Sequence, residues 1–324
     1  MSQSGEFDLI ARFFAPLASG YPGAYDLTDD AALLDVSDGN PRVVATDMLV
    51  EGVHFLPDDP ADRIAQKALR VNLSDIAAMG AEPEGYTLAM SLSTLWDDAW
   101  LEAAAAGLRV DQDRFGVHLL GGDTVSSGGV ASLSITVIGS VPNNQILRRS
   151  GAVSGDDLYV SGTIGDAGLG LRLLQENDDS GIDPALRAAA ISRYQLPEPR
   201  LRLGLALRSL VNACIDVSDG LVADLTHLAE SSDVAAILDL AAVPWSAAVE
   251  ACADYAVARR ITAGDDYELL FAAPASRRSA VEAAAETSGT VVTRIGSFAS
   301  GAGIRILDPA GDEIEVDDTG YRHR

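Results

Sequence analysis

Lysine is almost absent from this chain of 324 residues, because Lys67 is the only lysine among its 23 basic residues. Acidic residues number 48, which gives a formal net charge of −25 at neutral pH. Such a charge disfavours nonspecific binding to nucleic acid or to an anionic membrane. Most of the acidic excess is expected to be solvated surface, so only local clusters of carboxylates can carry a function.

Cysteine and long apolar runs are also scarce. Cys214 and Cys252 form neither a C-x-x-C pair nor a disulfide framework, which indicates a reducing compartment. Nowhere do 18 apolar residues run together, and the first residues lack the basic segment of a secretory signal. We therefore expect a soluble, cytoplasmic protein. Its length and its 48% hydrophobic residues favour two folded domains over disorder.

Several common catalytic motifs are missing. Lys67 follows no glycine loop, so there is no G-x-x-x-x-G-K-[ST] and a P-loop nucleotide site is excluded. The four histidines form no H-E-x-x-H and no serine stands in a G-x-S-x-G elbow, which argues against a zinc hydrolase and an α/β-hydrolase. The glycines at 162, 165, 168 and 170 lack the G-x-G-x-x-G spacing and are expected to form a strand-to-helix turn.

Helical and strand-like patterns alternate along the chain. The first half predicts helices over 6–18, 60–79 and 96–115, with Asp58 or Asp59 capping the second and Pro60 at its first position. Strands are predicted over 31–36, 42–49, 84–93, 118–123 and 130–141, and strands again alternate with helices after residue 156. A break rich in Arg, Gly and Ser lies near residue 148. The pattern predicts an α/β (α+β) protein with two domains, 1–148 and 149–324.

The pentapeptide DVSDG occurs twice, at 35–39 and at 216–220. The first copy lies between two strand-like runs and is followed by Pro41, so it is interpreted as a hairpin turn. The second copy joins a strand to a helix, which places Asp216 at a strand end and Ser218 and Asp219 at a helix N-terminus. Such a junction can cap itself. It can also hold a cation with its carboxylates while the helix N-terminus meets a phosphate.

Other acidic residues occupy comparable places. Asn72 lies in the apolar stripe of the helix over 60–79, and Asp75 follows one turn later, so both can face one polar pocket. An Asn that is simply hydrogen-bonded within a helix contact remains the alternative. Asp29-Asp30, Asp47 and Asp123 stand at strand ends or beside glycines, where they can also be plain turn formers. Their number favours a site for hard divalent cations, because Mg²⁺ combines carboxylates with water and substrate phosphates.

Six blocks of the sequence resemble the thiamine-monophosphate kinase family, in the ATP-binding superfamily of aminoimidazole ribonucleotide synthetase. The blocks are TDMLVEGVHF (46–55), NLSDIAAMGAEP (72–83), GGDT (121–124), RRSGAVSGDDLYVSG (148–162), DVSDGL (216–221) and GDDYELLF (264–271). The resemblance implies a two-domain aminoimidazole ribonucleotide synthetase-like fold that dimerises through its N-terminal sheet. It also implies a kinase that converts thiamine monophosphate to the diphosphate with ATP and several Mg²⁺ ions.

The resemblance further implies roles for individual residues. The magnesium ligands would be Asp30, Thr46, Asp47, Asp75, Asp123, Asp216 and Asp219. ATP would contact Gly122, Asp123, Arg149 and Ser218, with Arg148 as the alternative arginine, and the catalytic set would be Asp75, Asp123, Asp216 and Arg149. The thiamine pocket would be lined by His54, Glu268 and Tyr321, where Tyr321 takes a position at which the family often has tryptophan.

Two rival functions remain open at this stage. One is another enzyme of the same superfamily, although Cys214 and Cys252 do not match the N-terminal or C-terminal cysteines that two of those enzymes need. The other is a non-enzymatic cation-binding protein, which would bind metal without nucleotide. Replacing Asp75 or Asp216 with Asn is expected to lower kcat by orders of magnitude if the chain is a kinase.

Overall fold

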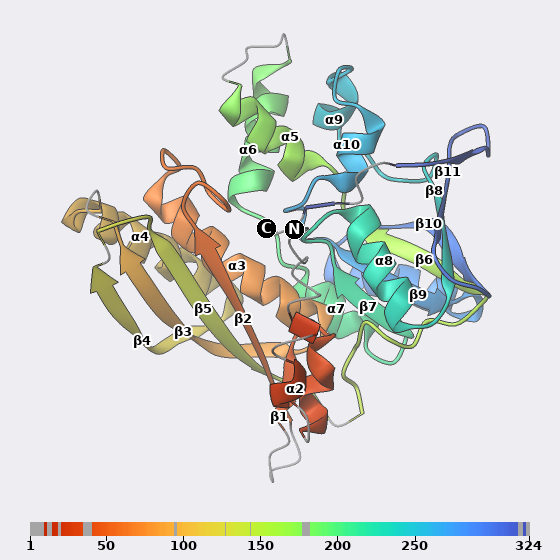
Figure 1. Ribbon diagram of the computed structural model, residues 1–324, viewed down its shortest axis with the longest axis horizontal. Coiled ribbons are helices and arrows are strands. Elements are labelled where there is room, and N and C mark those ends of the chain that lie inside the picture. The colour runs from red at the N-terminus through yellow and green to blue at the C-terminus, as the bar shows by residue number, and fades with distance from the viewer. Residues whose placement is uncertain are drawn as a thin grey trace.

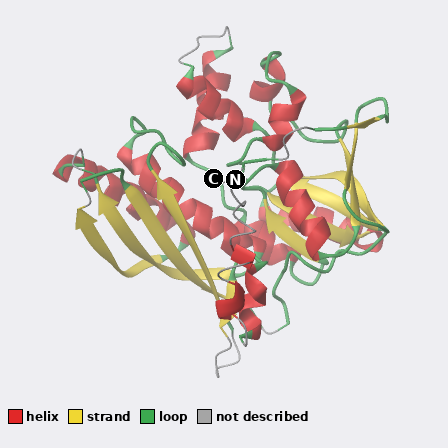
Figure 2. Ribbon diagram, viewed as in Figure 1, coloured by secondary structure: helices red, strands yellow, loops and turns green. Residues whose placement is uncertain are grey.

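Two β-sheets, each with its own helices, make up the protein (Figures 1 and 2). The computed structural model describes residues 10–11, 15–18, 21–34, 41–93, 96–126, 128–142, 144–176, 182–316 and 320–321. The predicted α/β (α+β) class is confirmed. In the described part of the chain, no helix has the length and apolar character needed to cross a membrane.

The first sheet has the strand order β1-β2-β5-β3-β4, and only β3 and β4 pair in parallel. Its strands are β1 (Ala32–Leu34), β2 (Arg42–Val50), β3 (Glu82–Leu92), β4 (His118–Ser126) and β5 (Ser132–Ser140). Helix α3 (Ala61–Ala78) packs on β2 and β5, and α4 (Asp98–Phe115) packs on α3. The side chains of β2 alternate accordingly, with Val43, Ala45 and Leu49 buried beneath α3 and the opposite face exposed.

The N-terminal predictions are only partly covered by the described residues. From the helix expected over 6–18, the structure describes α2 (Ala15–Ala18), followed by the 3₁₀ segment η2 (Pro22–Leu27). The first DVSDG lies outside the described residues. Its flanking strands β1 and β2 pair antiparallel with Leu34 opposite Arg42, as a hairpin requires.

The start of α3 differs from the prediction. The helix begins at Ala61, so Pro60 is the N-cap residue, and its cap has no side-chain hydrogen bond. Asp59 is turned away, because its carboxylate accepts from the backbone N–H of Leu56 at 2.8 Å and from the amide of Gln195 at 2.6 Å. The predicted cap by Asp58 or Asp59 is therefore wrong, since the carboxylate of Asp59 stabilises the preceding turn.

The second sheet has the order β12-β11-β8-β10-β6-β9-β7, in which only β8 and β11 pair in parallel. Its strands are β6 (Asp156–Ser161), β7 (Ala213–Asp216), β8 (Ala235–Asp239), β9 (Leu269–Pro274), β10 (Val292–Ala299), β11 (Ile304–Leu307) and β12 (Glu313–Ile314). Its helices are α5 (Asp166–Gln175), α6 (Pro184–Gln195), α7 (Leu201–Leu207), α8 (Leu221–Ser231), α9 (Ala247–Ala251), α10 (Val257–Thr262) and α11 (Arg278–Ser288), with a 3₁₀ turn η3 (Ala275–Arg277) before α11. The domain boundary near residue 148 stays a prediction, and it falls between β5 and β6.

Helix α3 joins the two halves. Fourteen of its 18 residues are buried, because it contacts β2 and β5 on one side and α7 and β7 on the other. A helix that is covered all round must satisfy every polar side chain within the protein. The polar residues of α3, including Lys67, Asn72, Ser74 and Asp75, therefore hold defined positions between the two sheets.

Candidate active site

A cavity of about 870 Å³ lies where both halves of the chain meet. Its wall combines β2 and the loop after it, α3, α5, α6, α10, and the loops that follow β7 and precede β9. Most of the sequence-predicted site residues line it, namely Asp30, Thr46, Asp47, His54, Asp75, Arg149, Asp216, Ser218, Asp219 and Tyr321. Segments far apart in the sequence thus converge on one space.

Three carboxylates form the floor of the cavity at one end. Asp30, Asp75 and Asp216 each place one oxygen within 4.8 Å of the others. They come from the segment before β1, from α3 and from the end of β7. The hydroxyl of Ser74 donates to Asp216 Oδ2 at 2.6 Å, and the guanidinium of Arg149 donates to Asp30 Oδ1 at 2.5 Å.

Burial and neighbouring negative charge raise the pKa values of Asp75 and Asp216. Burial raises the pKa of Asp216 to about 8, and the negative charge of Asp30 acts in the same direction, against the Ser74 hydrogen bond and Arg149. The pKa of Asp75 is also raised well above its ordinary value, by burial and then by Asp47 and Asp216. Carboxylates in this arrangement need a positive charge to ionise together.

The donor set fits a hard divalent cation. All three groups offer carboxylate oxygens, and Oδ2 of Asp30 is buried without a hydrogen-bond partner among the described residues. A buried carboxylate oxygen without a partner is costly, and a bound cation would satisfy it. Asp30, Asp75 and Asp216 could therefore hold Mg²⁺, with Asp47 beside them on the same wall.

Asn72 holds the backbone of Asp47, which lines the cavity beside this cluster. It is fully buried; its Oδ1 accepts from the backbone N–H of Asp47 at 2.9 Å, and its amide donates to Ala68 O at 2.9 Å. Asn72 therefore does not share the polar pocket with Asp75, and the alternative of a hydrogen-bonded helix contact is the one observed. Thr46 also lines the cavity, but its hydroxyl is engaged within the sheet, where it donates to Ile135 O at 3.1 Å.

The second DVSDG joins β7 to α8, as predicted, but its backbone N–H groups are not free. Asp224 Oδ2 accepts from the N–H groups of Ser218, Asp219 and Gly220 at 3.0, 3.1 and 3.2 Å. The junction thus caps itself, and the idea that these N–H groups meet a phosphate is wrong for this geometry. Ser218 can reach the cavity only through its hydroxyl. The sequence signal for Asp224 was an acid in the first turn of the helix.

Aromatic and acidic side chains form another part of the cavity wall. His54, Tyr194, Asp265, Tyr267 and Tyr321 belong to it. His54 accepts from the backbone N–H of Val50 through Nδ1 at 3.0 Å, so neutral His54 carries its proton on Nε2. Tyr321 lies at the mouth, about half exposed, and its backbone N–H donates to Asp219 O at 2.9 Å. A cation with an aromatic ring is the kind of ligand that this wall suits.

Comparison with known proteins assigns the family. Residues 28–141 match the family "AIR synthase related protein, N-terminal domain", and residues 153–308 match its C-terminal counterpart. The thiamine-monophosphate kinase of Caulobacter vibrioides is 43% identical over 92% of this chain and 85% of its own length. That of Escherichia coli K12 is 41% identical over 98% of both chains. The chain belongs to the thiamine-monophosphate kinase family.

A solved structure agrees with this assignment. The structure described as AaThiL complexed with AMPPCP and TMP superposes with a TM-score of 0.87 at 28% identity, over 100% of this chain and 99% of that chain. The predicted two-domain aminoimidazole ribonucleotide synthetase-like fold and the predicted enzyme class, a kinase, are both confirmed.

The position of Glu268 differs from the prediction. Glu268 is fully buried outside the cavity wall, where Arg193 donates to Oε1 at 2.7 Å and Arg200 Nε donates to Oε2 at 2.6 Å. The hydroxyl of Ser161 donates to the same Oε2 at 2.5 Å. Its predicted contact with thiamine has no support in this geometry. Asp265, three residues earlier, faces the cavity instead.

Gly122 and Asp123 also lie apart from the cavity. They belong to β4, the edge strand, and Asp123 pairs with Ala89 on the sheet face that α3 does not cover. Strands β5 and β3 separate β4 from β2, a distance of roughly 14 Å at about 4.8 Å per strand. Asp123 therefore does not join the other carboxylates within one chain. Arg148 points elsewhere too, paired with Asp29 at 2.8 Å and placed over the ring of Tyr25 at 3.7 Å.

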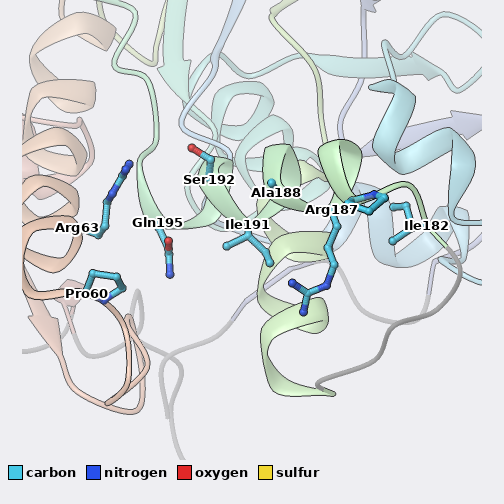
Figure 3. Close-up of a pocket in the computed structure, with 9 residues that line it drawn as sticks. Pro60, Arg63, Ile182, Arg187, Ala188, Ile191, Ser192 and Gln195 are labelled. Carbon is cyan, nitrogen blue, oxygen red and sulfur yellow. The ribbon is translucent and has the colours of Figure 1, made fainter.

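A second cavity of about 790 Å³ lies between the start of α3 and α6, and Figure 3 shows its lining. It contains Pro60, Ile191, Ser192 and the arginines Arg63 and Arg187, whose guanidinium groups point in opposite directions in this view. Among the described residues, no Asp or Glu lines it. It therefore lacks the convergent polar groups that mark a catalytic site.

Proposed function

We propose that this protein transfers the γ-phosphoryl group of ATP to thiamine monophosphate and so forms thiamine diphosphate. One observation carries the proposal: a single cavity joins a carboxylate cluster suited to Mg²⁺ with a wall of aromatic and acidic groups suited to a cationic heterocycle. The names of the similar enzymes, and the ligands named with AaThiL, support the same reaction.

The reaction needs little acid–base chemistry. A terminal oxygen of the monophosphate attacks the γ-phosphorus in line, a new P–O bond forms, and the bond to the bridging oxygen breaks, so that ADP leaves with the electron pair. The acceptor phosphate is already ionised near neutral pH, so the barrier is repulsion between two anions. The chain must therefore bring the phosphates together and offset their charge.

Particular residues would do this work. Asp30, Asp75 and Asp216 would hold several Mg²⁺ ions together with Asp47 and Asp219, which line the same cavity. When bound, Mg²⁺ supplies positive charge to the phosphoryl oxygens. Arg149 adds a guanidinium that stays protonated, since Asp30 raises its pKa even though burial opposes this. Ser218 would contribute a hydroxyl to the nucleotide.

The acceptor would occupy the end of the cavity near His54. A tyrosine ring at the mouth, Tyr321, can stack on a cationic thiazolium, and the carboxylate of Asp265 attracts the same charge. This arrangement favours thiamine monophosphate over a phosphate ester of similar size whose organic part carries no positive charge. Asp265 takes the part that the sequence prediction gave to Glu268.

We also propose a homodimer formed through the uncovered face of the first sheet. On this face the edge strand β4 exposes Leu120 and Val125, although apolar edge strands are normally protected. Packing of two copies on this face would bury them. It would also give Gly122 and Asp123 a path to the nucleotide of the partner subunit, which they lack within one chain.

The proposal is tested with the purified protein, ATP and MgCl₂, and a panel of acceptors analysed by chromatography. Thiamine diphosphate should form from thiamine monophosphate, with thiamine and pyridoxal phosphate as negative controls. The Asp75→Asn variant should lose activity by orders of magnitude. ATP hydrolysis without thiamine diphosphate would indicate a different acceptor, and metal binding without any nucleotide turnover would support a non-enzymatic cation-binding protein.

A further inference from the structure

Lys67 is caged at the acceptor end of the cavity. Its ammonium donates to the backbone carbonyl of His54 at 2.8 Å and to Asp265 Oδ2 at 2.9 Å. It also lies 3.8 Å from the centre of the Tyr194 ring, in the geometry of a cation–π contact. Only 2% of the residue is exposed, so its charge is balanced by these neighbours and not by water.

The contacts of Lys67 come from three separate segments, and each of them lines the cavity. His54 belongs to the loop after β2, Tyr194 to α6, and Asp265 to the loop before β9. Lys67 itself lies in α3, the helix held between both sheets. One ammonium group thus fixes three parts of the wall relative to the rigid helix that also carries Asp75.

The loop before β9 needs such an anchor. Asp265 and Tyr267 have φ angles of 72° and 49°, which are left-handed conformations that residues with side chains rarely adopt. Their backbone N–H groups donate to Ser218 O at 2.8 Å and to Val217 O at 2.7 Å. Strained residues of this kind persist only where their surroundings hold them, and they cluster at ligand sites.

The surroundings of Lys67 suit lysine better than arginine. The other 22 basic residues of the chain are arginine, and some of them pair with buried carboxylates such as Asp111, Asp157 and Glu268. Arg70 binds Asp111 with Nε at 2.7 Å and Nη2 at 2.8 Å, in the two-pronged manner of a guanidinium. The cage around Lys67 instead offers a carbonyl, a carboxylate oxygen and a ring face, which suit a compact ammonium with three donors.

We propose that Lys67 is a positioning residue for the acceptor substrate. Its ammonium holds the carboxylate of Asp265 and the loop of His54 where they face the acceptor, and a guanidinium at this position pushes them out of place. This inference rests on the proposed function, because the acceptor is thiamine monophosphate in that proposal. In the described part of the chain, the hydrogen bonds and the ring contact of Lys67 go to His54, Asp265 and Tyr194 and not to Asp30, Asp216 or Arg149, so we expect nucleotide binding to change less than acceptor binding.

The test compares Lys67→Arg, Lys67→Met and Asp265→Asn with Arg63→Met as matched control. Arg63 lies one turn before Lys67 on α3, at the second cavity, and its ion pair with Asp62 is long at 3.8 Å. For each variant, KM and kcat are measured for thiamine monophosphate. The dissociation constant of a non-hydrolysable ATP analogue with Mg²⁺ is measured by calorimetry, and thermal unfolding is recorded.

Both Lys67 variants should raise KM for thiamine monophosphate at least tenfold, while affinity for the ATP analogue stays within about threefold of the unmodified protein. The Arg63→Met control should change neither. A Lys67→Arg variant with normal KM and kcat would overturn the proposal, and so would an equal loss of acceptor and nucleotide binding. If the unmodified protein forms no thiamine diphosphate, the proposed function fails. The contact between Lys67 and Asp265 is then tested by the amine-labelling experiment described next.

A second measurement does not depend on activity or on a Lys67 variant. Because Lys67 is the only lysine, reductive methylation followed by mass spectrometry reports on one side-chain amine, with the α-amine of the chain as internal reference. Asp265→Asn removes the charge that holds the ammonium, so labelling of Lys67 should become at least fivefold faster. An unchanged rate would show that Asp265 does not hold Lys67 and would overturn the proposal.

Discussion

The Asp216→Asn substitution should make the metal-free protein more stable at high pH. Asp216 is buried beside Asp30, and its pKa in the folded chain is about 8, against 3.8 as its ordinary value. Between these pH values the folded chain holds a proton that the unfolded chain has released. The free energy of unfolding therefore falls as pH rises from about 4 to about 8.

The size of this effect follows from the two pKa values. At ~1.4 kcal/mol for each pH unit, the interval from 3.8 to about 8 corresponds to as much as roughly 6 kcal/mol. Asparagine does not ionise, and its side-chain oxygen can still accept the hydrogen bond from Ser74. At pH 9 the metal-free variant should therefore be more stable than the unmodified protein by up to this amount.

Magnesium should narrow the difference in unfolding free energy between the two proteins. A cation that binds only the folded state at 100 times its dissociation constant adds about 2.7 kcal/mol to stability. The unmodified protein should gain this stability, whereas Asp216→Asn, which lacks one ligand charge, should gain much less. Urea unfolding at pH 6 and pH 9, with EDTA or with MgCl₂, gives all the free energies.

If both proteins have the same unfolding free energy at pH 9 in EDTA and gain equally from MgCl₂, Asp216 neither carries a raised pKa nor binds the cation. Asp62→Asn serves as a control, because Asp62 is an acid in the first turn of α3 that does not line the cavity of the carboxylate cluster. It should change neither the pH dependence nor the gain from magnesium.

Three further predictions concern residues around the cavity. Glu268→Gln should destabilise the protein by ~3 to 5 kcal/mol in urea unfolding, because two partly buried arginines lose their shared, fully buried charge partner. KM for thiamine monophosphate should stay within about twofold at a temperature where the variant is folded; a large rise in KM would mean that Glu268 contacts the acceptor. Asp224→Ala should lower kcat at least tenfold and the free energy of unfolding by ~1 to 3 kcal/mol, since three backbone N–H groups of residues 218–220 lose their acceptor. Unchanged kinetics would mean that these residues keep their conformation without Asp224. His227 should stay neutral down to about pH 4 in an NMR titration, because burial and the nearby Arg149 lower its pKa to about 4. The free energy of unfolding should therefore fall as pH falls from about 6.5 to about 4, because the unfolded chain binds the proton first. A titration of His227 near pH 6.5 would contradict this.

The sequence predicted the elements well where the pattern was local. The apolar spacing of α3 and the alternating strands of the first sheet need only neighbouring residues, and these elements are observed. The predicted cap of α3 was wrong because the carboxylate of Asp59 is hydrogen-bonded to Leu56 and Gln195 instead. Gln195 is 136 residues away in the sequence. Such partners are set by tertiary packing, which the local sequence does not reveal.

The sequence indicated which acidic residues belong to the site, but not how their side chains are oriented in the fold. Strand ends and polar breaks in helices pointed to Asp47, Asp75 and Asp216, which share the cavity. The distinction between Asp265 and Glu268 depends on which of two carboxylates close in sequence turns toward Arg193 and Arg200, and no local pattern decides it. Lys67 was visible as the only lysine, but its partners lie in loops and helices that only the fold brings to α3.

The central claim is that Asp30, Asp75 and Asp216 hold magnesium against the phosphates of ATP and the acceptor. Its most direct test is a crystal grown with thiamine monophosphate and a non-hydrolysable ATP analogue, soaked in MnCl₂ and measured at the manganese absorption edge. The account predicts anomalous peaks within coordination distance of these three carboxylates and of the nucleotide phosphates. Both ligands bound in the cavity with no anomalous peak at these carboxylates would contradict it.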